Sequence, residues 1–188
     1  VRGGARQKAS VRMEDGTRGI AKFPKSNEDA STDSEAWKQT MLTVMGRASI
    51  TVPKSRLLRG KSRSVLLMKR FDRSQARRIP YISGLSAVQG NDGDTYTYLE
   101  LAEFIETFGS NPDRDLAELW RRALFSCAVG NTDNHLRNYG FLREEGGWGL
   151  SSAFDVNPTR GGGEKYLVTA LDFGRPEADA RIAFEVSD

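Results

Sequence analysis

The stretch "AVGNTDNHLRNYGFL", residues 128–142, gathers hydrogen-bonding and cation-binding side chains between two apolar segments. Within six positions it contains five polar residues: Asp133, Asn134, His135, Arg137 and Asn138. His135 is the single histidine of the chain. A helical pattern precedes these polar residues and the strand-like "NYGFL" ends the stretch, so we expect a loop between them. The loop is either a polar turn or a place where chemistry occurs.

The composition of the chain is that of a globular protein. Its 188 residues, 38% hydrophobic and 28% charged, suffice for one domain or for two small lobes. No segment approaches the ~20 apolar residues of a membrane span, and the polar start "VRGGARQKAS" is unlike a signal peptide. Cys127 is the single cysteine, which excludes an intrachain disulfide and favours the reducing cytoplasm. Because the first residue is Val1 and not Met, we expect a piece of a longer protein.

Charge is unevenly distributed, although the net charge is only +3. Residues 91–120 carry eight acids against Arg114. Residues 51–80 carry one acid, Asp72, against ten basic residues: Lys54, Arg56, Arg59, Lys61, Arg63, Lys69, Arg70, Arg73, Arg77 and Arg78. A basic segment of this kind either steers an anionic partner to the surface or is simply solvated.

The first third of the chain reads as β-β-α-β-β. "KASVRM" and "RGIAKF" flank the turn "EDGT", which predicts a hairpin with Lys22 on its second strand. Residues 31–46 offer several N-cap residues, then Trp37, Met41, Leu42 and Met45 at helical spacing, then Gly46 as a stop. Two strand-like segments follow at residues 55–58 and 64–71.

Residues 77–95 contain glycine-bearing breaks and connect to a helical second part. In residues 98–109, one helical face carries Leu99, Ala102, Ile105 and Phe108. Residues 111–130 predict a second helix, with Asn111 as N-cap, Pro112 at the first position and Gly130 at the end. Its expected buried stripe is Leu116, Leu119, Trp120, Ala123, Leu124 and Cys127.

The hairpin after the opening stretch brings distant carboxylates together. Its strands, residues 138–142 and 148–154, are joined by a turn at 143–147, so Asp133 and Asn138 lie near Asp155. Two carboxylates and an amide oxygen are hard ligands that suit Mg²⁺ shared with phosphates. In protein kinases the catalytic Asp precedes a metal-binding Asn by five positions, as Asp133 precedes Asn138. A kinase site also contains a strand lysine that pairs with a helix glutamate. Here Lys22 and Glu35 are the expected pair.

In this order, the motifs resemble those of the HipA-like serine/threonine kinases, toxins of bacterial toxin–antitoxin systems. "GGARQKA" is similar to the family's glycine-rich segment, and "IAKFP" to its nucleotide-lysine strand, which implies Lys22 as that lysine. "KRFDR" resembles the hinge, which implies that backbone around Lys69–Phe71 meets adenine and that Asp72 reaches the ribose. His135 is assigned either to support of the loop or to nucleotide contact.

The rest of the resemblance covers the catalytic residues. "GNTDNHLRN" resembles the catalytic loop, which implies Asp133 as base and Asn138 as metal ligand. "AFDVNP" resembles the segment of the second metal ligand, here Asp155. "LDFG" at 171–174 looks like the kinase Asp-Phe-Gly motif, but Asp172 lies 34 residues past Asn138, and we interpret it as structural.

The resemblance implies an α+β, two-lobed protein-kinase-like fold with a β-rich N-terminal lobe and a mainly helical C-terminal lobe. We expect the nucleotide-binding lobe with its hinge at residues 1–78 and the catalytic lobe at 79–188, both incomplete at the chain ends relative to the family. The family's regulatory phosphoacceptor serine would precede Val1.

The implied activity is ATP- and Mg²⁺-dependent phosphorylation of a protein Ser or Thr in the cytoplasm. The implied target belongs to the translation machinery, with an aminoacyl-tRNA synthetase as one candidate. The implied partner is a helix-turn-helix antitoxin, with DNA contacted through that complex. A non-catalytic alternative stays open: a nucleic-acid-binding or regulatory module that uses residues 51–80, or a pseudokinase that binds nucleotide. The first would bind with steep salt dependence and without need of Asp133 or Asp155.

Overall fold

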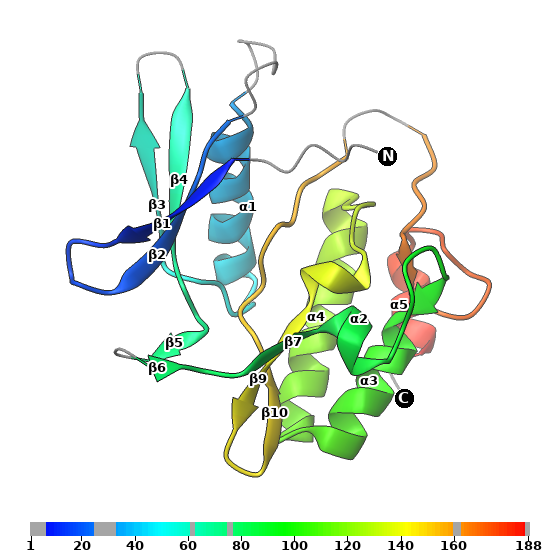
Figure 1. Cartoon of the computed structure of the whole chain (residues 1–188). Coiled ribbons are helices and arrows are strands. Elements are labelled where there is room, and N and C mark those ends of the chain that lie inside the picture. The colour runs from blue at the N-terminus through cyan, green and yellow to red at the C-terminus, as the bar shows by residue number, and fades with distance from the viewer. Residues whose placement is uncertain (1–6, 25–32, 61–62, 75–76, 160–162, 187–188) are drawn as a thin grey trace.

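The structure, a computed structural model, describes residues 7–24, 33–60, 63–74, 77–159 and 163–186. Figure 1 shows two parts: a sheet backed by one long helix, and a group of helices with smaller sheets. The first part is rich in strands and the second is mainly helical with short strands, which confirms the predicted α+β class. The boundary between residues 78 and 79 stays a prediction. Most of the glycine-rich segment, residues 3–6, lies outside the described residues.

The N-terminal sheet has four antiparallel strands in the order β1-β2-β4-β3. They are β1 (Lys8–Arg12), β2 (Arg18–Lys22), β3 (Ser55–Arg59) and β4 (Ser64–Lys69). The predicted hairpin is confirmed as β1 and β2, with Lys22 as the last residue of β2. The helix α1 (Ser34–Arg47) packs against this sheet, where Leu42 meets Leu66 and Met68.

The helix α1 differs from its prediction in two respects. Asp33 is its N-cap, but the helix continues one residue past Gly46, so the expected stop was wrong by one position. Trp37 is 50% exposed, whereas Glu35 and Lys38 are buried. The face of α1 that is turned inward at this end is therefore lined by charges that contact each other, and the apolar spacing did not reveal this.

The chain then passes through short strands into the helical part. These elements are β5 (Arg73–Ser74), β6 (Arg77–Arg78), β7 (Tyr81–Ser83), α2 (Gly84–Ala87), β8 (Tyr96–Thr97), α3 (Tyr98–Phe108) and α4 (Pro112–Val129). After them come the 3₁₀ turn η1 (Leu136–Asn138), β9 (Gly140–Glu144), β10 (Gly147–Leu150), β11 (Thr169–Ala170) and α5 (Ala180–Glu185). The predicted hairpin is β9 and β10, and β7 pairs with β9 to make a three-stranded antiparallel sheet.

The caps of α4 are as the sequence predicts. Asn111 accepts the N–H of Arg114, Pro112 opens the helix, and Gly130 ends it at a φ of 61°, a left-handed conformation that favours glycine. Its buried stripe holds Leu119 and Ala123 as expected, together with polar residues that the apolar pattern omitted: Asp115, Glu118, Arg122 and Ser126.

The buried face of α3 is rotated relative to the prediction. The buried residues are Tyr98, Leu101, Phe104 and Ile105, whereas Phe108 is 56% exposed. Apolar residues surround most of this helix, so spacing alone does not determine which side packs inward. The neighbours α4 and β10 decide it.

A small apolar cluster joins the two parts of the molecule. Met45 and Ile50 pack there against Phe125 of α4 and Ala153 of the segment after β10. This segment runs between α1 and α4 in Figure 1, so the chain that leads to Asp155 lies in the seam between sheet and helices. None of the described helices is long and apolar enough to cross a membrane.

Candidate active site

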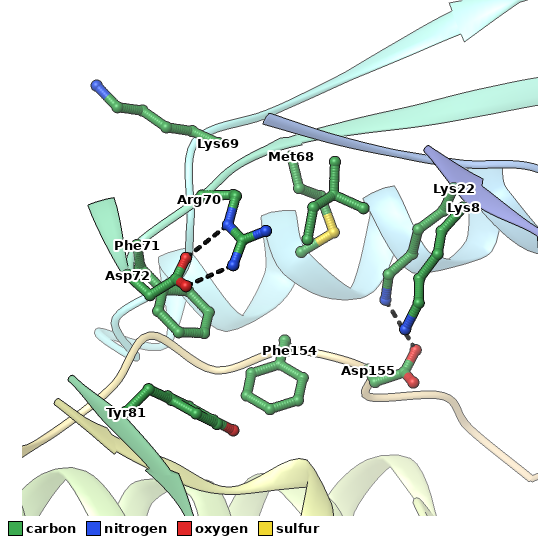
Figure 2. Close-up of a pocket in the computed structure, with 11 residues that line it drawn as sticks. Lys8, Lys22, Met68, Lys69, Arg70, Phe71, Asp72, Tyr81, Phe154 and Asp155 are labelled. Carbon is green, nitrogen blue, oxygen red and sulfur yellow. Dashed lines mark hydrogen bonds and ion pairs between the residues drawn. The ribbon is translucent and has the colours of Figure 1, made fainter. Parts of the chain in front are cut away.

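A cavity of about 350 Å³ lies where the N-terminal sheet, the segment after β4 and the segment after β10 meet. Its lining residues are Lys8, Ile20, Lys22, Met68, Lys69, Arg70, Phe71, Asp72, Tyr81, Phe154 and Asp155. Figure 2 shows aromatic rings toward one end and the Lys22–Asp155 pair toward the other. The cavity therefore offers an apolar end and a charged end.

Three aromatic rings form the apolar end. The rings of Phe71 and Phe154 stack with centroids 5.7 Å apart, and Tyr81 lies 6.2 Å from Phe71. Ile20 and Met68 line the same cavity from the sheet. Flat apolar walls of this kind suit a planar heteroaromatic ring.

The backbone of the predicted hinge has one donor that is not used by other backbone groups. The N–H groups of Lys69 and Arg70 donate to the carbonyls of Lys54 and Arg18, at 2.8 and 3.0 Å. Among the described residues no such acceptor meets the N–H of Phe71. The side chain of Lys69 points away from the cavity in Figure 2, and its Nζ lies 4.0 Å from Asp15. Of the predicted hinge residues Lys69–Phe71, Phe71 is thus the one whose N–H is not taken by another described backbone group, and the contact with adenine stays a prediction.

The carboxylate of Asp72 is already bound by two arginines. Arg70 donates to both of its oxygens, at 2.7 and 2.5 Å, and Arg73 also donates to it. Burial favours the neutral form, but the hydrogen bonds and charges of Arg70 and Arg73 outweigh it, and the pKa of Asp72 lies below its usual range. Asp72 lines the cavity, but a ribose hydroxyl would have to displace an arginine to reach it, and the predicted ribose contact stays a prediction.

The charged end is a chain of ion pairs between three segments. Nζ of Lys22 lies 3.1 Å from Oδ1 of Asp155, and Nζ of Lys38 lies 3.5 Å from the same oxygen. Lys38 also contacts Glu35 at 3.3 Å. The expected Lys22–Glu35 pair is therefore not formed. Lys38, one helical turn after Glu35, forms the ion pair with Glu35, whereas Lys22 forms an ion pair with Asp155.

Asp155 has a backbone conformation that is uncommon for a residue with a side chain. Its φ is 59°, in the left-handed region that aspartate enters more readily than most residues. Such conformations carry a cost and persist where the surroundings hold them, often at functional sites. Here the two lysines hold the carboxylate.

The residues of the predicted catalytic loop differ in how far they are exposed to solvent. The side chain of Asp133 is 72% exposed, and Nε2 of His135 lies 3.7 Å from its carboxylate. Nδ2 of Asn138 donates to the carbonyl of Asp133 at 2.9 Å, which ties the end of η1 to this loop. His135 thus lies beside Asp133 and lines neither of the cavities that hold the other candidates.

Asn138 and Asp155 come together in a second, small cavity. Both line it, and it adjoins the first because Phe154 and Asp155 line both. With Nδ2 of Asn138 donated to the loop, its Oδ1 is the atom that suits a cation. No cluster of three His, Cys, Asp or Glu occurs in the described part of the chain. One carboxylate and one amide oxygen nevertheless fit Mg²⁺, because this ion keeps several water or phosphate ligands.

The side chain of Asn134 anchors the loop to the backbone of Thr169. This side chain is buried, donates to the carbonyl of Thr169 at 3.0 Å and accepts the N–H of Thr169 at 3.1 Å. It also donates to the hydroxyl of Tyr98. Asn134 therefore shapes the loop. Asp172 lines neither cavity and accepts the N–H of Phe173, in agreement with the structural role assigned to "LDFG".

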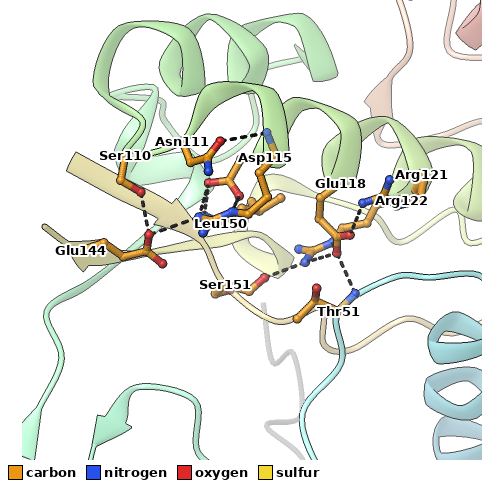
Figure 3. A network of polar contacts seen from close by, with 11 residues as sticks. Thr51, Ser110, Asn111, Asp115, Glu118, Arg121, Arg122, Glu144, Leu150 and Ser151 are labelled. Carbon is orange, nitrogen blue, oxygen red and sulfur yellow. Dashed lines mark hydrogen bonds and ion pairs between the residues drawn. The ribbon is translucent and has the colours of Figure 1, made fainter. Parts of the chain in front are cut away.

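The buried charges of α4 fix the segment that leads to Asp155. Arg122 donates to Glu118 at 2.7 Å and to the carbonyl of Ser151 at 2.7 Å, and Glu118 accepts the N–H of Thr51 at 2.9 Å. One turn earlier, Asp115 accepts the N–H of Leu150. Figure 3 shows these contacts along one side of α4. The helix thus joins the segment after α1 to the segment after β10.

The sequence matches the family model of the HipA-like C-terminal domain over residues 2–186. This chain belongs to that family. The predicted resemblance is therefore confirmed, and the HipA-like assignment rests on nearly the whole sequence. No curated protein matches the sequence significantly.

Two solved structures share the fold of this HipA-like chain. One is HipA of Shewanella oneidensis MR-1, in a complex with HipB and its operator DNA, with a TM-score of 0.66 and 16% identity. It is matched over 95% of this chain and 50% of that one. The other is the proinflammatory kinase CtkA of Helicobacter pylori, with a TM-score of 0.63 and 19% identity over 79% of this chain and 53% of that one. The kinase-like fold is thus confirmed, and this chain spans about half the length of either structure.

Sequence reasoning did not single out several residues of the HipA-like site. Lys8 faces Lys22 across the hairpin and lines the same cavity, and counting outward from the turn at residues 14–17 would have found it. Lys38 could be found from its spacing to Glu35, since residues three apart on a helix are neighbours. For Phe154 and Tyr81 the sequence carries no signal, because their place beside Phe71 depends on how the two parts pack.

Proposed function

We propose that this chain is the catalytic part of a HipA-like kinase that transfers the γ-phosphoryl group of ATP to a serine or threonine hydroxyl of a protein. The observation that supports it best is the 3.1 Å contact between Lys22 and Asp155, residues from the two parts of the chain, at the charged end of the cavity. A lysine and a metal-binding aspartate in one place are what phosphoryl transfer requires.

In this proposal adenine packs against the aromatic end that Phe71, Phe154 and Tyr81 form, and the phosphates extend toward Lys8 and Lys22. Asn138 and Asp155 would hold Mg²⁺, which supplies charge stabilisation of the phosphates when bound. Glu35 would act indirectly, by holding Lys38 beside Asp155.

Asp133 would orient the acceptor hydroxyl and accept its proton. Its high exposure supports this role, because the acceptor belongs to another protein and must reach the carboxylate from solvent. An ordinary aspartate is a weak base at neutral pH, so positioning provides most of its contribution. His135 beside it would hold the orientation of the carboxylate.

The partners follow from the solved relatives and from the family resemblance. HipA of S. oneidensis is in a complex with HipB and operator DNA. We propose an antitoxin with a helix-turn-helix as the partner of this protein, with DNA contacted through that complex. A translation protein in the cytoplasm, such as an aminoacyl-tRNA synthetase, is the proposed target.

The first test is transfer of ³²P from γ-labelled ATP, with Mg²⁺, to protein by the wild type and by Asp133→Ala. We expect the variant to lose about 10²-fold or more of the rate, since a positioned base contributes at least this much. Asp113→Ala, which removes an exposed aspartate at the start of α4, is the matched control and keeps the rate.

Equal transfer by wild type and Asp133→Ala would exclude Asp133 as the base. Nucleotide binding without any transfer by the wild type would favour the pseudokinase alternative.

A further inference from the structure

A second hollow, of about 590 Å³, lies beside the turn of the β1–β2 hairpin. It is lined by four arginines, one aspartate and small polar residues: Ser10, Arg12, Asp15, Gly16, Thr17, Arg18, Arg70 and Arg73. Arg70 lines both this hollow and the 350 Å³ cavity in which ATP is proposed to bind, the nucleotide cavity. None of the residues assigned to phosphoryl transfer lines it, so the proposed kinase chemistry does not explain it.

The hairpin carries like charges directly opposite one another at two places. Lys8 pairs in register with Lys22, and Arg12 pairs in register with Arg18. Directly opposed like charges destabilise an antiparallel pair unless something compensates them. The lysine pair lines the nucleotide cavity, where phosphates would compensate it. The arginine pair lies on the same face of the hairpin, four residue pairs nearer the turn, and it lines the second hollow.

No carboxylate neutralises this arginine pair within the described part of the chain. Nε of Arg12 reaches only the carbonyl of Gly16, at 3.4 Å, and neither Arg12 nor Arg18 forms an ion pair with a described residue. Asp15 lines the hollow, but its Oδ1 accepts from Thr17 and its Oδ2 faces Lys69.

The other two arginines are held in place on the hinge side. Arg70 and Arg73 both bind Asp72, and their side chains are 26% and 17% exposed. The N–H of Arg70 donates to the carbonyl of Arg18 at 3.0 Å, which fixes the hinge against the hairpin. Two arginines are thus fixed by a carboxylate and two are uncompensated, around one polar hollow.

We propose that this hollow binds a phosphomonoester dianion, such as the phosphoryl group of a phosphoserine in a protein. Guanidinium groups present forked donors that match phosphate oxygens in pairs. A phosphomonoester carries close to two negative charges at neutral pH, which suits the uncompensated Arg12 and Arg18. Four guanidinium groups around one hollow suit a single dianionic group, whereas a nucleic acid presents a row of phosphates to an extended surface.

The test is calorimetric titration of the whole chain at constant ionic strength with a short phosphoserine peptide, its unphosphorylated form and inorganic phosphate. We expect binding of the phosphopeptide and none of the unphosphorylated peptide. Arg18→Gln weakens binding about tenfold, the value of one charge-assisted hydrogen-bond pair, and Arg12→Gln with Arg18→Gln abolishes it. Binding of inorganic phosphate alone, with the same arginine dependence, would assign free phosphate as the ligand.

Two matched variants separate this hollow from other cationic places. Arg59→Gln removes an exposed arginine at the far end of β3 and keeps full binding. Lys22→Gln alters the nucleotide cavity and also keeps full binding of the phosphopeptide. Arg18→Gln relieves the like-charge pair, so its melting temperature without ligand equals or exceeds that of the wild type, which shows that the variant is folded.

Three results would overturn the proposal. In the first, Arg18→Gln binds the phosphopeptide as tightly as Arg59→Gln does. In the second, Lys22→Gln abolishes binding while Arg18→Gln retains it. In the third, single-stranded DNA competes more tightly than the phosphopeptide, with a salt dependence that corresponds to several released counterions.

Discussion

Asp155 is the residue on which most of the proposed site depends. It lines both cavities, takes two lysines on one oxygen and has a left-handed backbone. The two ammonium groups orient its carboxylate, which in the proposed kinase would hold Mg²⁺ together with Asn138. Lys38 is a positioning residue in this arrangement, because it lines neither cavity and acts through Asp155 and Glu35.

Removal of Lys38 should destabilise the protein, because its partner Glu35 is fully buried. We expect Lys38→Met to lower the free energy of unfolding by about 3 kcal/mol, as when one member of a buried ion pair is lost. Lys38→Met combined with Glu35→Leu should recover much of this loss. Urea unfolding followed by circular dichroism measures both.

Lys54→Met is the control for Lys38→Met, since Lys54 is exposed, and its effect should stay within about 0.5 kcal/mol. Equal losses for the two lysine variants would show that the buried pair contributes nothing specific.

The helix α4 is the element that supports the candidate site, although none of its residues lines the 350 Å³ cavity. Its inward face carries Asp115, Glu118 and Arg122 at spacings of three and four residues, where an apolar stripe was expected. These side chains bind backbone groups of two other segments, at Thr51 and at residues 150–151. Buried backbone groups without strand partners need such acceptors and donors. The polar residues of α4 therefore replace a sheet as the support of the segment before Asp155.

Neighbouring arginines of α4 allow a matched test of this support. Arg122 is buried and donates to Glu118 and Ser151, whereas the side chain of Arg121 is 36% exposed and donates to Glu118. We expect Arg122→Met to cost about 3 kcal/mol of unfolding free energy and Arg121→Met less than about 1 kcal/mol.

Chemical denaturation of both variants, made in the same background, measures the difference. If Arg122→Met were no more costly than Arg121→Met, the buried network would not be what holds the segment.

The molecule as a whole places its cavity between a sheet and a helical part that are joined by few other contacts. The lining comes from β1, β2, β4, the hinge, β7 and the segment after β10. A ligand in this cavity touches both parts, so its binding free energy adds to the stability of the folded arrangement.

ATP with Mg²⁺ should therefore raise the melting temperature of the whole chain. At a nucleotide concentration of about 100 times Kd, the expected gain is ~2.7 kcal/mol, or roughly 5–10 °C for a chain of this size. Asp155→Asn should lose the part of this shift that requires Mg²⁺, and Asp172→Asn should keep it.

Differential scanning fluorimetry with ATP, in the presence of Mg²⁺ or of a chelator, gives this comparison. A Mg²⁺-dependent shift that disappears in Asp172→Asn and persists in Asp155→Asn would reverse the assignment of the two aspartates.

The sequence by itself determined the features that depend on neighbours along the chain. Turn residues and alternation specified both hairpins, and Asn111, Pro112 and Gly130 specified the limits of α4. The five-residue spacing of Asp133 and Asn138 and the following hairpin pointed to the site, because a hairpin brings its two ends together by local geometry. The family resemblance named the same residues.

Only the tertiary structure decided which partner each charged residue takes. Lys22 and Asp155 are 133 positions apart, and their contact depends on how the sheet packs on the helical part. The same packing brings Lys38 to the carboxylate of Asp155 and turns polar residues of α4 inward. Ion pairs and apolar contacts between distant segments carry no periodic signal in the sequence, since any lysine of suitable reach satisfies a carboxylate. The physical reason is that local pattern specifies an element, whereas the packing of elements specifies what each side chain meets.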